Sequence, residues 1–134
     1  MFVLLVLLGF GLCAGNIQKP GKLIGKLETI YHGVTGDVYV SEESDSKLNI
    51  INFNYDGEGP ATVFWIGLKG KHGPLIDSSG ILVPDENGQT GPLKEYKQAN
   101  ITINLPNNIK SSQVKWLAVW CQIFKLDFGH VFFP

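Results

Sequence analysis

Apolar and polar residues alternate with the two-residue period of β-strands in several short segments of the chain. The alternation is clearest in 99–105, where every second residue is apolar. The apolar positions there are Ile101, Ile103 and Leu105, and the polar positions are Asn100, Thr102 and Asn104. Because successive side chains of a strand point to opposite sides, this pattern predicts one buried face and one hydrated face.

Glycine and proline separate these segments at short intervals, as they do where strands are joined by turns. The chain contains 16 Gly and 7 Pro. Strands are expected at 23–31, 37–41, 47–55, 61–68, 80–84, 99–105, 114–124 and 130–133. The 3.6-residue apolar period of a capped helix does not occur, apart from one turn near 92–98. The sequence therefore predicts an all-β fold, an antiparallel β-sandwich of about eight strands.

Segment 114–124 is apolar on both faces, which predicts a strand that is covered on two sides. One face carries Leu117, Val119, Cys121 and Ile123. The other face carries Trp116, Ala118, Trp120, Gln122 and Phe124. Gln122 is the one polar residue of the segment from 116 to 124, so we expect the Cys121 face to be the one that packs in the core.

The first fifteen residues form an apolar run that is too short to span a bilayer but suits a secretory signal peptide. The small residues Cys13 and Gly15 precede a cleavage point that would leave Asn16 as the first residue. An uncleaved anchor and a buried first strand are the alternatives. We therefore expect a signal peptide at 1–15 and one β domain at 16–134, secreted and extracellular, with no stable membrane span.

Composition and charge narrow the classes of partner. The 134 residues are 44% hydrophobic and 17% charged, as in ordinary globular domains. The 11 basic residues are scattered along a chain of net charge -1, so no basic stripe is available to bind a nucleic acid.

The sequon Asn-Ile-Thr begins at Asn100, on the predicted hydrated face. We expect Asn100 to carry a glycan if the chain is secreted.

Metal and cofactor chemistry has little support among the side chains. A zinc site needs about four ligands with close spacing, whereas His32, His72 and His130 are dispersed, so no metal site is predicted. Haem is the one cofactor candidate, and its axial ligands would come from these histidines or from Cys121. The acidic residues of 55–60 and 84–88 indicate turns rather than calcium loops. No nucleophile elbow is present, so an enzyme acting on its own is not expected.

Cys121 would be the only thiol of the mature chain, because signal cleavage removes Cys13. Three roles are open to it. It could be a small buried hydrophobe, since free cysteine is among the most buried residue types. It could bridge to another chain, as an unpaired secreted cysteine often does. It could also be a redox group or the ligand of a prosthetic group, which would require thiolate character and access.

Four stretches together resemble the DM-thirteen domain, a module found near the N-terminus of Skeletor-type proteins. They are HGVTGDVYV (32–40), LNIINFNYDGEGPATVFWIG (48–67), LPNNI (105–109) and VWCQIFKLDFGHVFFP (119–134). The resemblance runs from about Gly25 to Pro134. It implies an extracellular β domain, often joined to DOMON domains that bind haem or sugar. It also implies that Cys121 is the family's signature cysteine, proposed to transfer electrons as a bare thiol or as a ligand.

Two functional hypotheses follow from these features. The first is a secreted single-domain redox or electron-transfer module that uses Cys121 and acts on extracellular or cell-surface proteins, including DOMON-containing ones. The alternative is a non-enzymatic interaction module of the extracellular matrix or cell surface, in which Cys121 is structural. Its contact surface would be formed by the loops at 56–60 and 69–74, because binding residues concentrate on loops held by a rigid scaffold.

Overall fold

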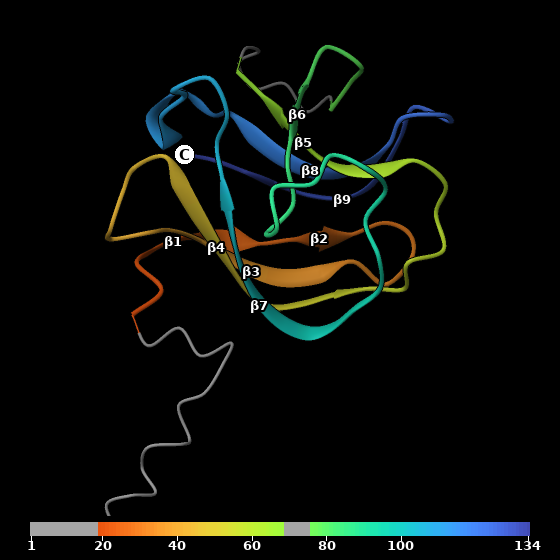
Figure 1. Ribbon diagram of the computed structural model, residues 1–134, viewed down its shortest axis with the longest axis horizontal. Coiled ribbons are helices and arrows are strands. Elements are labelled where there is room, and N and C mark those ends of the chain that lie inside the picture. Colours follow the sequence, from red (N-terminus) through yellow and green to blue (C-terminus); the bar gives the residue numbers. More distant parts are fainter. Residues whose placement is uncertain (1–18, 69–75) are drawn as a thin grey trace, which may run out of the picture.

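The chain folds as a sandwich of two antiparallel sheets in a computed structural model that describes residues 19–68 and 76–134 (Figure 1). The first sheet has the strand order β1-β3-β4-β7 and the second has the order β2-β9-β8-β5-β6. The strands are β1 (Lys22–Lys26), β2 (Glu28–Thr29), β3 (Thr35–Val40), β4 (Lys47–Tyr55), β5 (Thr62–Gly67), β6 (Ile81–Val83), β7 (Tyr96–Asn104), β8 (Trp116–Cys121) and β9 (Leu126–Phe132). The predicted all-β sandwich is confirmed.

Helical structure is confined to a single 3-10 turn, η1 (Ser111–Gln113), within the described part of the chain. The helical turn predicted near 92–98 is wrong, because Tyr96 begins β7 and the residues just before it are irregular. No helix in the described ranges is long and apolar enough to cross a membrane. The expected signal peptide at 1–15 and the candidate ligand His72 lie outside the described residues, so both stay predictions.

The segment expected as one strand at 23–31 is two strands that belong to different sheets. β1 pairs with β3 in the first sheet, and β2 pairs with β9 in the second. Leu27 lies between them, is 5% exposed, and its N–H donates to the carbonyl of Gly36. The chain therefore crosses from one layer to the other at a buried leucine, which raises the number of strands above the eight expected.

The strand expected at 114–124 ends at Cys121, earlier than the apolar pattern predicts. Residues 122–125 form a turn, and Leu126 at the start of β9 pairs back with Cys121. Lys125 adopts a positive φ of 54°, which reverses the chain. As a result Ile123 and Phe124 are 62% and 65% exposed, and their predicted places on two covered faces are wrong.

The main core lies between the two sheets. Alternate residues of β7 point into it, and Ile101, Ile103 and Leu105 are all less than a tenth exposed. Leu117, Val119 and Cys121 also face this core, as their shared face predicts. The polar residues Asn100 and Thr102 are half-buried on the opposite side of β7. The period of two therefore assigned the correct faces to both strands.

A second apolar cluster covers the outer face of the second sheet. It contains Trp116, Ala118 and Trp120 from β8 together with Val63 and Trp65 from β5. The rings of Trp65 and Trp120 stack with centroids 6.0 Å apart, and Trp65 Nε1 donates to the carbonyl of Asp77 at 3.0 Å. Both faces of β8 are therefore buried, which is why no polar residue occurs between 116 and 121.

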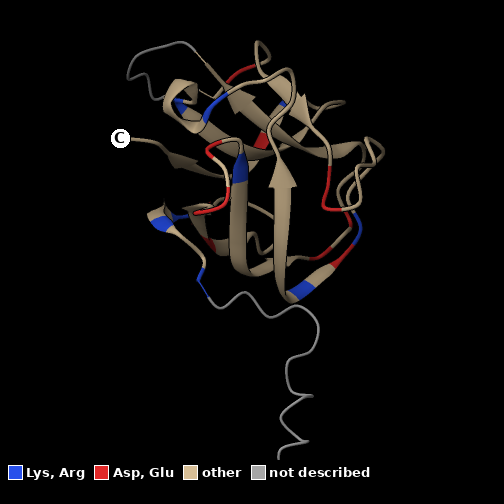
Figure 2. Ribbon diagram, turned by 60° about the vertical axis from the view of Figure 1, so that its left-hand side comes forward, with Lys and Arg blue, Asp and Glu red and all other residues tan. Residues whose placement is uncertain are grey.

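Charged side chains are mixed in sign over the surface. Figure 2 shows basic and acidic residues interspersed on the ribbon rather than gathered on one face. Several of them pair, such as Lys26 with Asp37 at 2.9 Å and Lys94 with Glu86 at 2.7 Å. Exposed pairs of this kind contribute little to stability, so the fold depends mainly on its two apolar clusters.

Candidate functional site

Cys121 is the last residue of β8 and is completely buried. It pairs with Thr62 of β5 on one side and with Leu126 of β9 on the other. It is also the free cysteine of the described residues. The thiol thus lies at the end of a central strand, where the sheet gives way to loops.

Two backbone groups from surface loops hold the sulfur. The thiol lies 3.0 Å from the carbonyl oxygen of Pro60, to which it donates, and Phe124 N–H donates to Sγ at 3.4 Å. Among the described residues no charged side chain bonds the sulfur. The carbonyl accepts the S–H, an interaction that a thiolate cannot make. In this closed arrangement the hydrogen bonds of the sulfur therefore go to backbone groups from two loops.

The loop that carries Pro60 is fastened by Tyr55, the last residue of β4. The Tyr55 hydroxyl accepts the N–H of Gly59 at 2.9 Å and donates to its carbonyl at 3.3 Å. Burial raises the pKa of Tyr55 above its ordinary value of 10.0, and hydrogen bonds with Thr62 and Gly59 offset only part of this rise. The hydroxyl therefore stays protonated and keeps both bonds to the loop.

Gly59 leaves no room for a side chain. A Cβ atom there would lie 2.4 Å from Cε2 of Phe128 and 2.6 Å from Oγ1 of Thr62. The φ of Gly59 is not positive, so its backbone conformation does not require glycine. Glycine is required here because no space is left for a side chain. The close approach of this loop to the sheet therefore depends on the missing Cβ.

His32 and Asp56 close the same end of the sandwich. His32 Nδ1 lies 3.0 Å from Asp56 Oδ2, and the His32 ring lies 4.4 Å from the ring of Phe128. Burial pushes the pKa of Asp56 upward, but hydrogen bonds from Glu58 N–H and His32 more than offset this, so the pKa lies below its ordinary value of 3.8. Asp56 is therefore a carboxylate that ties His32 to the loop.

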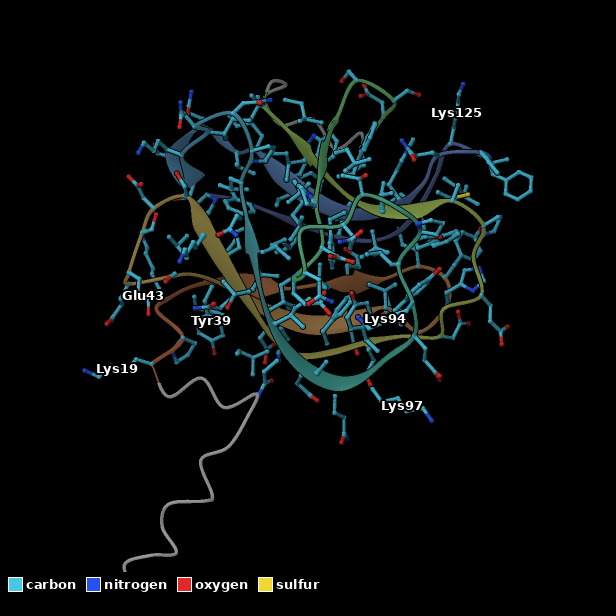
Figure 3. All side chains as sticks on the ribbon, viewed as in Figure 1. Lys19, Tyr39, Glu43, Lys94, Lys97 and Lys125 are labelled. Carbon is cyan, nitrogen blue, oxygen red and sulfur yellow. The ribbon has the colours of Figure 1, made fainter. Side chains whose placement is uncertain are left out.

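Exposed apolar side chains gather at this end. The β8–β9 turn and the loop between β4 and β5 lie side by side, and Gln122 N–H donates to the carbonyl of Ala61 (Figure 1). Ile123 and Phe124 in this turn are exposed, as are Leu126 at the start of β9 and Ile30 and Tyr31, whose N–H groups donate to the carbonyl of Phe128 in β9. Lys125 projects outward from the same turn (Figure 3). Exposed apolar side chains beside a lysine are typical of a contact surface for another protein.

The two histidines that the structure describes, His32 and His130, bond aspartates rather than Cys121. His130 pairs in register with Ala118, on the outer face of the second sheet, whereas Cys121 faces the core. Its Nδ1 lies 2.6 Å from Asp127, whose pKa is raised by burial and only partly lowered by His130. His32 is bound to Asp56. Each described histidine thus bonds an aspartate through Nδ1, and the hydrogen bonds of the Cys121 sulfur go to backbone groups rather than to either ring.

Neither metal ligands nor the groove near the chain's C-terminus point to other chemistry. No group of three or more His, Cys, Asp or Glu side chains that could hold a metal occurs in the described ranges. A groove of about 580 Å³ is lined by Gly21, Lys22, Ile24, Val40, Ser41, Glu42, Ser111, Ser112, Phe133 and Pro134. This groove contains no histidine or cysteine and is separate from the residues around Cys121.

The sequence pointed to Cys121 but not to the residues that hold it. Tyr55 and Gly59 fall in the stretch YDGEGP, which the sequence indicated only as a turn. The one signal available was that this stretch and the cysteine both belong to the most specific motifs of the family resemblance. The sequon residue Asn100 accepts the N–H of Asn52 through Oδ1 at 2.9 Å and lies in the first sheet, whereas Cys121 lies in the second.

Comparison with known proteins identifies the family. The family described as "Electron transfer DM13" matches residues 26–133. Two Drosophila melanogaster proteins, Protein Skeletor isoforms B/C and isoforms D/E, are each 39% identical to the chain over 119 residues. These alignments cover 89% of this chain but only 14% and 8% of the two relatives, so the chain spans a small part of their length. No solved structure matches the chain significantly. The chain therefore belongs to the electron transfer DM13 family.

Proposed function

We propose that this chain is a secreted module that exchanges electrons with an extracellular or cell-surface protein, and that Cys121 is its redox group. The observation that carries the proposal is the position of Cys121 directly beneath two surface loops, with Pro60 O at 3.0 Å and Phe124 N at 3.4 Å. The description of the family as electron transfer supports a redox role. DOMON-containing proteins are the partner class that the family resemblance suggests.

The proposed chemical step is thiol–disulfide exchange with a disulfide of the partner. Displacement of the Pro60 loop exposes Cys121, which loses its proton to solvent and attacks one sulfur of that disulfide. A new S–S bond joins the two proteins, and the other partner sulfur leaves as a thiolate and takes up a proton. Cys121 is oxidised and the departing partner sulfur is reduced, so the step needs no further oxidant. Neighbouring apolar side chains, Ile123 and Phe124, would seat the partner.

Glutathione disulfide provides a simple probe of this step. The full chain with Cys13→Ala is incubated with glutathione disulfide under native conditions, and the mixed disulfide is located by peptide mass spectrometry. We expect one adduct on Cys121, and no adduct when Cys121→Ser is added. Modification of Cys121 only in denaturant would contradict the redox proposal. An absorption spectrum of the same protein tests separately for a bound chromophore such as haem.

A structural cysteine in an interaction module is the second candidate, favoured by the complete burial of Cys121 in the core. Here Cys121→Ala lowers the free energy of unfolding by about 1 to 2 kcal/mol, as for a small buried side chain, and leaves binding intact. Ile123→Ser with Phe124→Ser, both at exposed positions, instead removes binding to matrix deposited by cultured cells. Loss of binding in Cys121→Ala while the domain stays folded would rule out this candidate.

A further inference from the structure

We propose that Tyr55 is a latch: its hydroxyl holds the segment Gly59–Pro60 over Cys121, and release of this segment exposes the sulfur while the sandwich stays folded. The inference deepens the proposed redox function by assigning the group that controls access to its thiol. It concerns the movement of a loop, which can be measured without a redox partner. The latch and the redox function can therefore fail independently of each other.

The latch is strong because two hydrogen bonds of the Tyr55 hydroxyl go to one residue, Gly59, in addition to its bond with Thr62. Gly59 is buried, and its N–H and C=O both bond the Tyr55 hydroxyl. Loss of the hydroxyl would leave the N–H and C=O groups of Gly59 buried without this partner. Leaving buried polar groups unpaired costs more free energy than the hydrogen bonds contribute when they are made. The closed position of Gly59 consequently depends on a single oxygen atom.

Tyr55 itself is fixed by the core, so it can hold the loop without moving. It ends β4, is 1% exposed and packs in the cluster between the sheets. The loop on the other side of the bond is different, since Glu58 and Pro60 are exposed and contribute nothing to the core. A loop with exposed residues that is hydrogen-bonded to a rigid, buried residue is expected to open locally with less free energy than global unfolding requires.

Movement of the latched segment changes the surroundings of the thiol directly. Pro60 follows Gly59 and supplies the carbonyl that accepts the Cys121 S–H at 3.0 Å. Thr62 Oγ1 also donates to this carbonyl, at 3.5 Å. The next fixed points along the chain are the backbone oxygens of Ala61 and Thr62, which both accept hydrogen bonds from backbone N–H groups. An opening that starts at Gly59 therefore lifts Pro60 from the sulfur and stops where β5 begins.

The test compares two tyrosine-to-phenylalanine variants that each delete one buried hydroxyl. In Tyr55→Phe the bonds to Gly59 are lost, whereas in Tyr96→Phe the lost bond is the one to Glu86, at 2.7 Å. Tyr96 is 4% exposed, so the two changes are closely matched. The full chain is alkylated with iodoacetamide under native conditions, and mass spectrometry follows the Cys121 peptide alone. We expect alkylation about tenfold to a hundredfold faster in Tyr55→Phe, and little changed in Tyr96→Phe.

Low concentrations of urea distinguish opening of the loop from unfolding of the domain. Opening of the loop exposes little surface, so the alkylation rate should stay nearly constant until the unfolding transition begins. A rate that rises steeply with urea from the lowest concentrations, in step with the unfolded fraction, would overturn the latch. Equal acceleration in the two variants would overturn it as well.

Hydrogen exchange in the unaltered chain provides a test that does not depend on any variant folding. The amide of Gly59 is held by Tyr55, and the amide of Phe124 is held by Cys121 Sγ. We expect hydrogen exchange at Gly59 and alkylation of Cys121 to report the same equilibrium constant for opening of the loop. This constant should exceed the opening constant that hydrogen exchange reports for the amides of β8. Protection of Gly59 equal to that of the amides of β8 would refute the proposal.

Discussion

Gly59 is the position at which the packing around Cys121 should be most sensitive to added volume. A Cβ atom there would lie 2.4 Å from Phe128 Cε2, 2.6 Å from Thr62 Oγ1 and 2.9 Å from the Tyr55 hydroxyl. Favourable contacts between heavy atoms need about 3.5 to 4.0 Å. Phe128 is 2% exposed and Tyr55 is 1% exposed, so neither side chain can swing out into solvent. Gly59→Ala must therefore displace the loop or distort the core.

The expected loss of stability is the sum of two effects. Overpacking of a well-packed core usually lowers the free energy of unfolding by about 1 to 3 kcal/mol, and three simultaneous short contacts favour the upper end. Displacement of the loop also weakens the bonds between Gly59 and Tyr55, by roughly 1 kcal/mol. We expect a total of about 3 to 4 kcal/mol, which lowers the melting temperature by about 10 °C or more in a domain of this size.

Urea unfolding followed by tryptophan fluorescence measures this loss, since the chain has 3 Trp, all buried. Gly91→Ala is the matched control, because a Cβ at Gly91 would meet no atom within 4 Å. Its free energy of unfolding should change by less than about 0.5 kcal/mol. If Gly59→Ala proves as stable as Gly91→Ala, the close approach of the loop to Phe128 and Tyr55 is wrong.

The remaining predictions concern acid stability and modification. Burial raises the pKa of Glu86, but Lys94 and Tyr96 lower it more, so it lies below the ordinary 4.5. A lowered carboxyl pKa contributes stability that is complete above the ordinary value and is lost as pH falls through the folded value. Lys94→Met should therefore flatten the acid side of the stability profile, measured by urea unfolding at several pH values, whereas Lys97→Met should not. For the sequon, we expect the chain secreted from eukaryotic cells to carry a glycan on Asn100, measured as a loss of mass on treatment with a glycosidase. Thr102→Ala should remove this mass difference, and Thr102→Ser should keep it. An unaltered chain without the mass difference would contradict glycosylation of Asn100.

Local pattern was sufficient for the faces of the strands. In β7 from Asn100 onward and in β8 up to Cys121, each side chain lies on the side that the period of two predicts, because the pleat of a regular strand fixes that side without reference to the rest of the fold. The same reasoning failed after Cys121. Gln122, Ile123 and Phe124 continue the alternation in composition, but pairing of Leu126 with Cys121 requires the chain to turn there. Only the neighbouring strand could decide where β8 ends.

The division of 23–31 between two sheets has a similar cause. Both halves of this segment are compatible with a strand, and its one glycine, Gly25, lies within β1 rather than at the crossing at Leu27. The position of this crossing follows from the pairing of β1 with the nearby strand β3 and of β2 with β9, which lies near the other end of the chain. Pairings of this kind depend on the global arrangement, which a short window of residues cannot report.

The sequence by itself determined the all-β class, the core face of Cys121 and the motifs that place the chain in its family. The tertiary structure decided what surrounds the thiol. The carbonyl of Pro60 and the amide of Phe124 bond the sulfur, and the Tyr55 hydroxyl bonds Gly59, the residue before Pro60. Tyr55 and Cys121 lie on different sheets, and they meet only because the two layers pack face to face. Hydrogen-bond distances across such an interface depend on that packing, so no spacing along the chain could have specified them.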